Sequence, residues 1–333
     1  ADVNVLKLDG TARVATRALE FAKGGLQPVM LSERLRGVYT DAAGQMEAVS
    51  DVTLTGGRMV GTADVSVSNF GFQTTRLGRV SNVNGDVRFS DLFSLTTEPS
   101  QVVTIGSMNP GIPLSDGRLV FGFSEGRDVA VESAAFPFAG GTLALSPFNW
   151  ILGREDQHVE VTADAIDLAK LVSILKLPKI EAEGTVSGRF PIDVERSKVL
   201  IRNARLFADD GGGRVAYLGD AADSAAQSDA NVRLAFEALK DFDFTVLEVG
   251  LDGDVADRIK ITLKLAGKSR NDITYGSNAE ILRGQPFEFN IGVDSALAEL
   301  FRSSQFYTNQ QKLTDFVVQE VITDRGLKPA KNE

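Results

Sequence analysis

Side chains that could do acid–base or metal chemistry are few and scattered in this sequence of 333 residues. The single histidine, His158, would have to be the base of any Ser-His-Asp triad. It lies in a polar stretch that is typical of a loop or of the start of a strand. Because the chain has one histidine and no cysteine, a zinc site built from several histidines or thiolates is excluded.

Two glycine-rich or acidic turns could in principle bind an ion. Residues 211–213 are three glycines that could surround a phosphate, but the strand-like residues 214–217 follow them where a phosphate site needs a helix N-terminus. Asp252, Asp254 and Asp257 could bind calcium, but they lack the spacing of an EF-hand loop. Both segments are therefore interpreted as turns between strands.

The paired carboxylates Asp241 and Asp243 alternate with phenylalanines, as expected for the solvated face of a strand. Their proximity alone does not indicate a glycosidase. The sequence also contains neither a P-loop nor a dinucleotide-binding glycine motif. We therefore predict that the protein is not an enzyme and has no catalytic residues, no metal ion and no cofactor.

The charge and hydropathy of the chain limit its partners. The formal net charge is −10 and the sequence pI is about 4.9, so nucleic acid is not expected as a partner. No apolar run reaches about 18 residues, the length that a membrane-spanning helix needs. The sequence opens at Ala1 without a signal peptide, and we expect any signal or membrane anchor to lie upstream in a longer protein.

Alternation of apolar and polar residues with a period of two dominates the sequence. It is clearest in residues 259–265 and 287–293, and it recurs in 119–123 and 232–236. A strand places successive side chains on opposite faces, so each segment predicts one dry and one wet face, as in antiparallel sheets. The turn signals between such runs are Gly56-Gly57, Asn84-Gly85-Asp86, Asp116-Gly117, Gly140-Gly141, Asp210–Gly213 and Asp252-Gly253-Asp254.

Helical spacing interrupts this pattern in three places. Asp164 is a suitable N-cap for a helix that ends at Pro178. Two short amphipathic helices are predicted at the C-terminus, after Asp294 and after Asn309. In chain order we expect the N-terminal part of a curled sheet over 1–219 with a helix near 165–177, a flexible loop over 220–230, strands over 231–293, helices over 294–327 and a tail over 328–333.

A weak repeat and the number of strands bear on the architecture. Segments that begin at Asp116 and at Glu183, about 70 residues apart, share the order of turn, strand, loop, strand, Gly-Gly and strand. Roughly twenty strands are predicted, and open sheets rarely exceed about ten without curling or splitting. The sheet must therefore become a sandwich, a barrel or a gutter bent lengthwise.

Several segments in order resemble a known family. They are residues 80–91 (VSNVNGDVRFSD), 105–123, 134–145, 181–192, 211–218, 235–253 and 285–290. Together they resemble the C-terminal "dicarboxylate transport" region of YdbH-type, AsmA-like proteins, which are related to TamB and to bridge-like lipid transfer proteins. The resemblance implies a mainly β protein whose long antiparallel sheet is curled into an elongated, taco-like groove. It also implies a body in the periplasm of a Gram-negative bacterium, an upstream inner-membrane anchor, phospholipid as cargo and a small outer-membrane lipoprotein as a partner.

On this interpretation the apolar strand faces shield acyl chains, since each buried CH₂ contributes about 0.8 kcal/mol. The alternation pattern selects as groove-lining candidates Leu119, Phe121, Phe123, Leu234, Phe236, Ile261, Leu263, Phe287 and Phe289. Two alternatives stay open. One is an envelope assembly module that pairs with an outer-membrane partner through its terminal strand. The other is a dicarboxylate-binding transport protein, which would need convergent Arg or Lys side chains.

Overall fold

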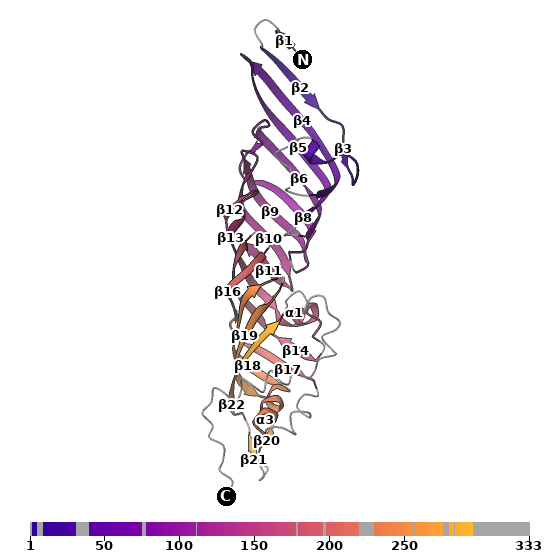
Figure 1. Cartoon of the computed structure of the whole chain (residues 1–333). Helices are drawn as coiled ribbons and strands as arrows, with labels where there is room; N and C mark the ends of the chain where they lie inside the picture. The colour runs from indigo at the N-terminus through magenta and orange to yellow at the C-terminus, as the bar shows by residue number, and fades with distance from the viewer. Residues whose placement is uncertain are drawn as a thin grey trace. The chain divides into compact units, whose positions relative to one another are not determined.

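The described part of the protein is mainly antiparallel β-sheet, as expected (Figure 1). The computed structural model describes residues 2–4, 9–30, 40–74, 78–110, 112–177, 179–195, 198–219, 230–255, 257–275, 280–282 and 284–295. Within them, 20 strands belong to one sheet and two form a separate hairpin. Within these described residues the sheet does not close into a barrel.

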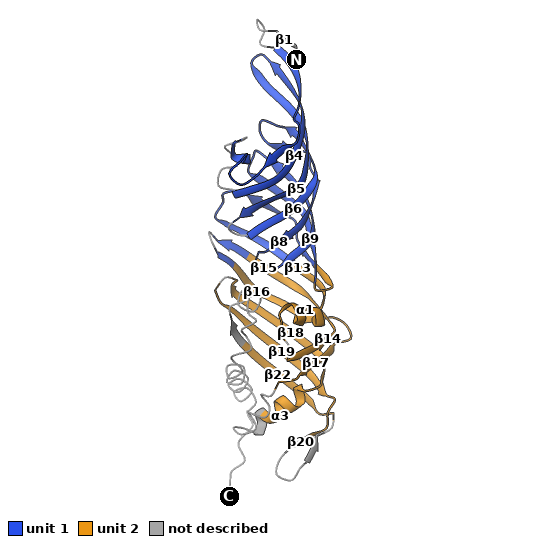
Figure 2. Cartoon of the chain, turned by 90° about the vertical axis from the view of Figure 1, so that its right-hand side faces the viewer, with its two compact units in different colours: residues 1–138, 143–161, 193–199 blue, residues 139–142, 162–192, 200–333 orange. Residues whose placement is uncertain are grey.

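The chain divides into two compact units (Figure 2). Unit 1 comprises residues 1–138, 143–161 and 193–199, and unit 2 comprises residues 139–142, 162–192 and 200–333. The strands of unit 1 are β1 (Asp2–Asn4), β2 (Asp9–Ala15), β3 (Leu19–Phe21), β4 (Thr40–Thr55), β5 (Arg58–Thr74), β6 (Gly78–Asp91), β7 (Thr96–Thr97), β8 (Gln101–Met108), β9 (Leu114–Ser124), β10 (Asp128–Phe138) and β12 (Phe148–Ile151), with the 3-10 turn η1 (Pro28–Met30).

Unit 2 holds most of the remaining elements. They are β14 (Ile180–Glu183), β17 (Gly213–Tyr217), β18 (Phe242–Asp254), β19 (Ile259–Ser269), β20 (Ile273–Tyr275), β21 (Glu280–Leu282), β22 (Pro286–Ser295) and the helices α1 (Leu168–Ile174) and α3 (Ala230–Leu239). Four strands have residues in both units, namely β11 (Gly141–Leu145), β13 (Asp156–Asp167), β15 (Thr185–Glu195) and β16 (Lys198–Ala208).

Most strands pair with near neighbours in the sequence, so the sheet is a meander. In the hairpin of β4 and β5, Gly56 and Gly57 take φ values of 55° and 82°, as a two-residue turn with both central residues at positive φ requires. The two copies of the weak repeat correspond to β9–β10–β11 and β15–β16–β17, each with a glycine turn before its short third strand.

Two predicted turns are wrong, because Asn84-Gly85-Asp86 lies inside β6 and Asp116-Gly117 lies inside β9. A third, Asp252-Gly253-Asp254, forms the paired end of β18. Gly85 pairs with Val67 on one side and Val103 on the other, and a Cβ there would lie 2.6 Å from the carbonyl oxygen of Val102. This glycine therefore allows close approach of a neighbouring strand rather than a chain reversal. Such close contacts and register shifts recur in both units and curl the sheet.

The helix predicted after Asp164 begins later than expected. Asp164 lies in β13, and Asp167 is the N-cap of α1, where its carboxylate accepts a hydrogen bond from the backbone N–H of Lys170 at 3.1 Å. The strand β13, which pairs with both β11 and β15, continues to Asp167. The expected C-terminal helix pair beyond residue 295 lies outside the described residues, as do residues 220–229 of the expected loop.

The strand predicted from Val232, Leu234 and Phe236 is wrong, because these residues belong to α3. Alternation over three apolar positions is a short signal, and the segment is rich in alanine and leucine, which favour helices. Ala235, Phe236 and Ala238 are buried in α3, which packs against β17, β19 and β20.

Candidate functional site

Unit 1 carries a row of apolar residues that are direct cross-strand partners across seven strands. Partners that lie directly opposite share one face of a sheet. The row, one residue from each strand, consists of Leu19, Met46, Val67, Gly85, Val103, Leu119 and Ala134. We call the face that carries this row the unit 1 apolar face. The predicted groove residue Leu119 lies in it.

Phe121 and Phe123 lie on the same face of β9 as Leu119, since they follow it at two-residue intervals. Phe121 is paired with Val131 on β10, and Phe123 is paired with Val129. The next strand, β12, continues the face with Phe148 and Trp150, whose rings make an edge contact at 6.2 Å.

A buried polar residue, Gln101, lies on this face. It lies opposite Phe121. Its side-chain oxygen accepts a hydrogen bond from the backbone N–H of Arg88 at 2.7 Å, and its amide nitrogen donates to the carbonyl of Pro99 at 3.0 Å. The polar groups of Gln101 are thus satisfied within the chain and are not directed at a ligand.

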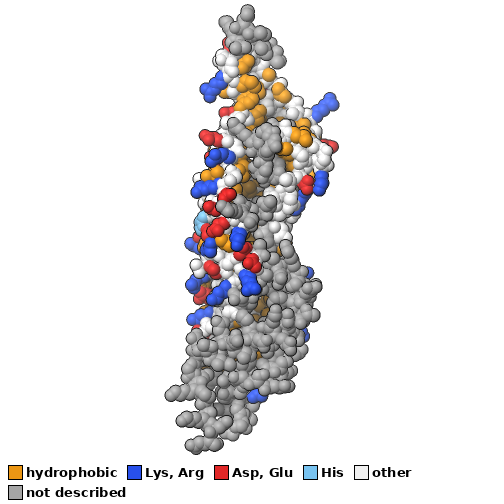
Figure 3. Space-filling model, viewed as in Figure 1, with side chains coloured by type: hydrophobic (Ala, Val, Ile, Leu, Met, Phe, Trp, Pro, Cys, Tyr) orange, Lys and Arg blue, Asp and Glu red, His pale blue; other side chains and the backbone are white. Residues whose placement is uncertain are grey.

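The unit 1 apolar face is partly core and partly accessible. Val103 and Ala134 are buried, and Leu19, Met46 and Val67 pack against the buried cluster of Phe21, Ala42 and Phe70. Met46, Val67, Leu119, Phe121 and Phe123 are half-buried, whereas side chains in a dry interior would be fully buried. Figure 3 shows hydrophobic side chains of unit 1 gathered along a strip that charged side chains flank. Water or a flexible apolar ligand can therefore reach this face.

The opposite face of unit 1 is polar. Arg88 on β6 pairs with Asp64 on β5 at 2.8 Å, and the Ser66 hydroxyl donates to the Asp86 carboxylate at 2.6 Å. The hydrogen bond to Asp64 is the largest cause that raises the pKa of Arg88, followed by the charge of Asp64 and that of Glu98. The two faces of the sheet therefore differ as the alternation predicted.

Unit 2 repeats this arrangement over four strands. Leu263 on β19 is the partner of Val249 on β18 and of Ile291 on β22, and Val249 is the partner of Leu206 on β16. Ile261 lies opposite Leu251, which lies opposite Ala204. The candidates Ile261 and Leu263 thus share one face, which we call the unit 2 apolar face.

Phe287 and Phe289 extend the unit 2 apolar face along β22. Their rings stack at 6.0 Å, and Phe289 makes an edge contact with Phe242 at 5.3 Å. Phe289 is only 3% exposed, whereas Ile261, Leu263 and Phe287 are half-buried. The aromatic cluster is therefore partly core. The aliphatic row beside it is also partly core, because Leu251 and Ile261 pack against the buried Ile201, Ala204 and Ile259.

Charges again occupy the other face. Lys264 lies between Leu263 and Leu265 in the sequence, but its side chain points to the polar face. There its Nζ forms an ion pair with the Glu288 carboxylate at 3.3 Å. Glu248, the cross-strand partner of Lys264, forms an ion pair with Arg205. Leu263 and Lys264 are thus adjacent residues on opposite faces.

The remaining two candidates lie on α3. The Phe236 ring is buried and lies 5.5 Å from the Tyr217 ring, whereas Leu234 is half-buried. Both are therefore helix packing positions rather than strand positions. Sequence reasoning missed Met46, because small residues dilute the alternation of β4 at Ala48 and Ser50. Its period-two spacing with Val52 and Leu54 was the available signal.

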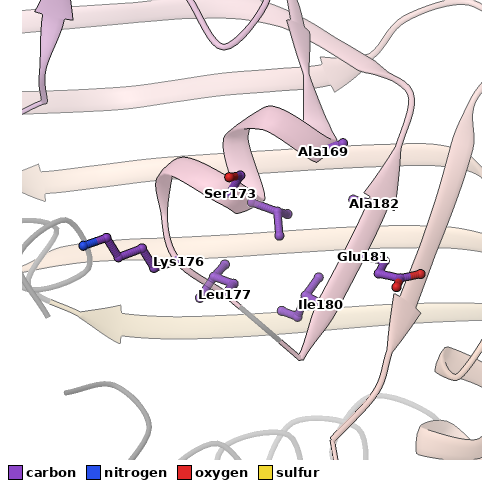
Figure 4. A pocket seen from close by; sticks show the side chains of 8 residues that line it. Ala169, Ser173, Lys176, Leu177, Ile180, Glu181 and Ala182 are labelled. Carbon is purple, nitrogen blue, oxygen red and sulfur yellow. The ribbon is translucent and has the colours of Figure 1, made fainter. Parts of the chain in front are cut away.

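A pocket of about 400 Å³ lies between α1 and β14 in unit 2 (Figure 4). Its lining residues are Ala169, Val172, Ser173, Lys176, Leu177, Ile180, Glu181 and Ala182. Leu177, Ile180 and Ala182 gather at its centre, while Lys176 and Glu181 extend outward (Figure 4). The pocket is therefore apolar at its base and charged at its rim.

Polar groups that could suggest catalysis have structural partners. Nδ1 of the exposed His158 lies 2.8 Å from an Asp193 carboxylate oxygen on β15. Asp252 accepts a hydrogen bond from the backbone N–H of Asn203 at 2.9 Å. Within the described ranges, no three His, Cys, Asp or Glu residues cluster as metal ligands would.

Asp241 and Asp243 form ion pairs with arginines. Nε of Arg214 lies 2.6 Å from Asp241, and Nε of Arg270 lies 2.7 Å from Asp243. The hydrogen bond to Asp241 is the largest cause that raises the pKa of Arg214, and that to Asp243 the largest that raises the pKa of Arg270. These carboxylates therefore hold arginines in place on the polar face.

The described residues define a mainly β protein whose open antiparallel sheet has one largely apolar face and one charged face. The chain belongs to the YdbH-like family: the family model described as "Intermembrane phospholipid transport protein YdbH" matches residues 1–315. This membership supports phospholipid transport between membranes, and thus a place in the cell envelope, at the level of the family. No curated protein and no solved structure matches the chain. In the described part of the chain, no helix has the length and apolar character to cross a membrane.

Proposed function

We propose that this chain is a non-catalytic segment of a phospholipid bridge across the periplasm, and that its apolar sheet faces form a groove that shields acyl chains. The main support is the unit 1 apolar face, where registered apolar partners run across seven strands and where Met46, Val67 and Leu119 are half-buried. Membership in the YdbH-like family supports phospholipid as the cargo.

The two faces have the properties that such a groove needs. An acyl chain loses contact with water wherever it lies on a continuous apolar surface, and each buried CH₂ contributes about 0.8 kcal/mol. The polar face, with pairs such as Arg88–Asp64 and Lys264–Glu288, keeps the other side of the sheet solvated. Lipid head groups would stay in water at an open edge of the groove.

We also propose that the full protein is anchored in the inner membrane of a Gram-negative bacterium and meets a small outer-membrane lipoprotein. This proposal rests on the family resemblance rather than on the geometry of the described residues. Fractionation of cells that produce the full-length protein, followed by site-specific crosslinking to outer-membrane lipoproteins, tests it. Recovery in the cytosol would overturn it.

Photocrosslinking tests the groove itself. A photoreactive amino acid is placed at Phe121, at Leu263 and, as the matched control, at Lys264, and phospholipid adducts are measured by mass spectrometry. Phe121 and Leu263 lie on the apolar faces, whereas Lys264 neighbours Leu263 but faces the polar side. We expect adducts at the first two positions and few at Lys264.

Equal labelling at Leu263 and Lys264 would contradict the groove, since nonspecific lipid contact does not distinguish faces. A purified protein with a stoichiometric protein partner and no copurifying phospholipid would instead support the assembly module.

The dicarboxylate alternative has less support from the described residues. A dicarboxylate site needs cationic groups that converge on the ligand, but Arg214 and Arg270 are already bound to carboxylates of the chain. Titration calorimetry with a C4-dicarboxylate should therefore show no tight binding. A micromolar or stronger signal would reverse this ranking.

A further inference from the structure

The pocket beside α1 is built against one strand of unit 2. Helix α1 packs on β14, and the backbone N–H of Ile180 donates to the carbonyl of Leu177 at 3.1 Å, which fixes the link between helix and strand. Figure 4 shows Ile180 and Leu177 directed toward one another below the helix. The base of the pocket is therefore held by backbone geometry.

The pocket continues into the unit 2 apolar face through direct cross-strand partners. Ala182 at its base lies opposite Val215 on β17, and Val215 lies opposite Phe242 on β18. Phe242 contacts the Phe289 ring at 5.3 Å, and Phe289 stacks on Phe287. Ile180 likewise lies opposite Tyr217. The pocket thus lies on the same face of the sheet as the groove candidates of β22, and the intervening Phe242 and Phe289 side chains are buried, at 0% and 3% exposed.

The residues that line the pocket indicate which class of ligand it can bind. Of the eight lining residues only Lys176 and Glu181 are charged, and both extend away from the central Leu177 and Ile180 (Figure 4). Glu181 is an ion-pair partner of Arg214 at 3.9 Å. A free fatty acid would need a cation at the base of the pocket for its carboxylate, whereas a phospholipid chain ends in a methyl group that needs none. A cavity of about 400 Å³ is at the lower end of small-ligand sites and suits one chain rather than a whole lipid.

We propose that the α1–β14 pocket binds the end of one acyl chain of a phospholipid whose remainder lies on the unit 2 apolar face. The pocket beside α1 is then a site that holds the phospholipid at one position along the groove. This inference rests on the proposed function, because it assumes that phospholipid occupies the apolar face.

The test places the photoreactive amino acid benzoylphenylalanine at Ser173, which lines the pocket and is exposed enough to tolerate substitution. The matched control is Lys170, an exposed residue of the same helix that does not line the pocket. Leu263 is the reference position for the apolar face. Each protein is incubated with vesicles of phosphatidylethanolamine and phosphatidylglycerol, or with palmitate alone, and lipid adducts are quantified after illumination.

We expect about tenfold more phospholipid adduct at Ser173 than at Lys170, as the contact of about two buried CH₂ groups predicts. Ala169→Trp fills the pocket from an exposed helix position and should lower the Ser173 adduct by a similar factor while leaving the Leu263 adduct unchanged.

Equal adducts at Ser173 and Lys170, or no effect of Ala169→Trp, would overturn the pocket while Leu263 labelling still supported the groove. Palmitate labelling Ser173 as strongly as the phospholipid would overturn the choice of ligand. Loss of labelling at Leu263 and Phe121 would instead contradict the proposed function itself.

Discussion

Met46 on β4 and Val67 on β5 are direct cross-strand partners, and both side chains are half-buried on the same face of the sheet. Their neighbours along the strands, Glu47 and Ser68, are exposed on the other face. The pair continues into Leu19 on one side and Gly85 on the other. This cross-strand pair is therefore part of the row of partners that crosses seven strands of unit 1.

Val67→Asp should disrupt this surface locally. A carboxylate placed among Met46 and its neighbours loses part of its hydration without gaining a partner, so we expect the free energy of unfolding to fall by about 1–3 kcal/mol. Phospholipid adducts at Phe121 should also decrease. Denaturant unfolding and the photocrosslinking assay measure the two effects.

Ser68→Asp is the matched control, because Ser68 is exposed on the polar face and lies opposite Gln45. Its unfolding free energy should stay within about 0.5 kcal/mol of the parent protein. Equal losses for Val67→Asp and Ser68→Asp would show that the two faces do not differ as described.

Asp91 makes the stability of the turn after β6 sensitive to acid. Its pKa is lowered from 3.8, chiefly by the hydrogen bond from the Ser94 hydroxyl and then by that from the Ser94 backbone N–H. Because the folded pKa lies below the unfolded one, the stabilisation is present above pH 3.8 and is lost as the pH falls through the folded pKa. Asp91→Asn should therefore lower unfolding stability at neutral pH, with a difference that shrinks in acid. A pH-independent difference would contradict this assignment.

The arginine ion pairs should lose their contribution to stability at high pH rather than in acid. The pKa values of Arg88, Arg214 and Arg270 are raised above the ordinary arginine value by hydrogen bonds to their carboxylate partners. Stabilisation of this sign is complete below the unfolded pKa and is lost only as the pH rises through the folded one. Urea unfolding should therefore show no loss from arginine deprotonation between about pH 6 and 9, where all three stay charged. A decline in that range that Arg214→Met abolished would contradict this expectation.

Phe236→Ala tests the assignment of α3 as a packed helix. The Phe236 ring is 5% exposed and lies against Tyr217, so its removal should cost about 3–5 kcal/mol of unfolding stability. Arg233→Ala, at an exposed position of the same helix, should change stability by less than about 0.5 kcal/mol. Similar small effects for both variants would mean that Phe236 of α3 does not pack against Tyr217 as described.

Sequence alternation predicted the strands best where one face is dry and the run is long. Residues 259–265 and 287–293 form paired strands whose apolar residues share one face, as expected. The run from Val232 to Phe236 failed because three alternating apolar residues also fit a helix, in which Ala235, Phe236 and Ala238 are buried.

The cross-strand register could not be predicted from the sequence, because it depends on partners far apart in the chain. Asn84-Gly85-Asp86 has the composition of a turn, yet Gly85 lies mid-strand where Val102 and Val103 approach it. The α1 pocket was likewise not predicted, since it needs Leu177 and Ile180 to meet below a helix whose cap is Asp167 rather than Asp164. Local sequence patterns identified the apolar faces of single strands. Strand pairing determined which apolar residues of neighbouring strands lie side by side on one face.

Gly188 on β15 tests the close strand contacts that curl the sheet. A Cβ at this position would collide with the carbonyl oxygen of Arg205 and lie 2.8 Å from the Cα of Leu206, both backbone atoms of β16. Because backbone cannot move aside as a side chain tip can, Gly188→Val should cost about 1–3 kcal/mol or more of unfolding stability. Thermal or denaturant unfolding measures this loss.

Gly122 provides the comparison, since it also lies inside a strand but a Cβ there would meet only the Cα of Pro99, at 3.8 Å. Gly122→Val should therefore be close to neutral, because the space is free and valine favours strands. If Gly188→Val were tolerated as well as Gly122→Val, the approach of β15 to β16 would have to be looser than described.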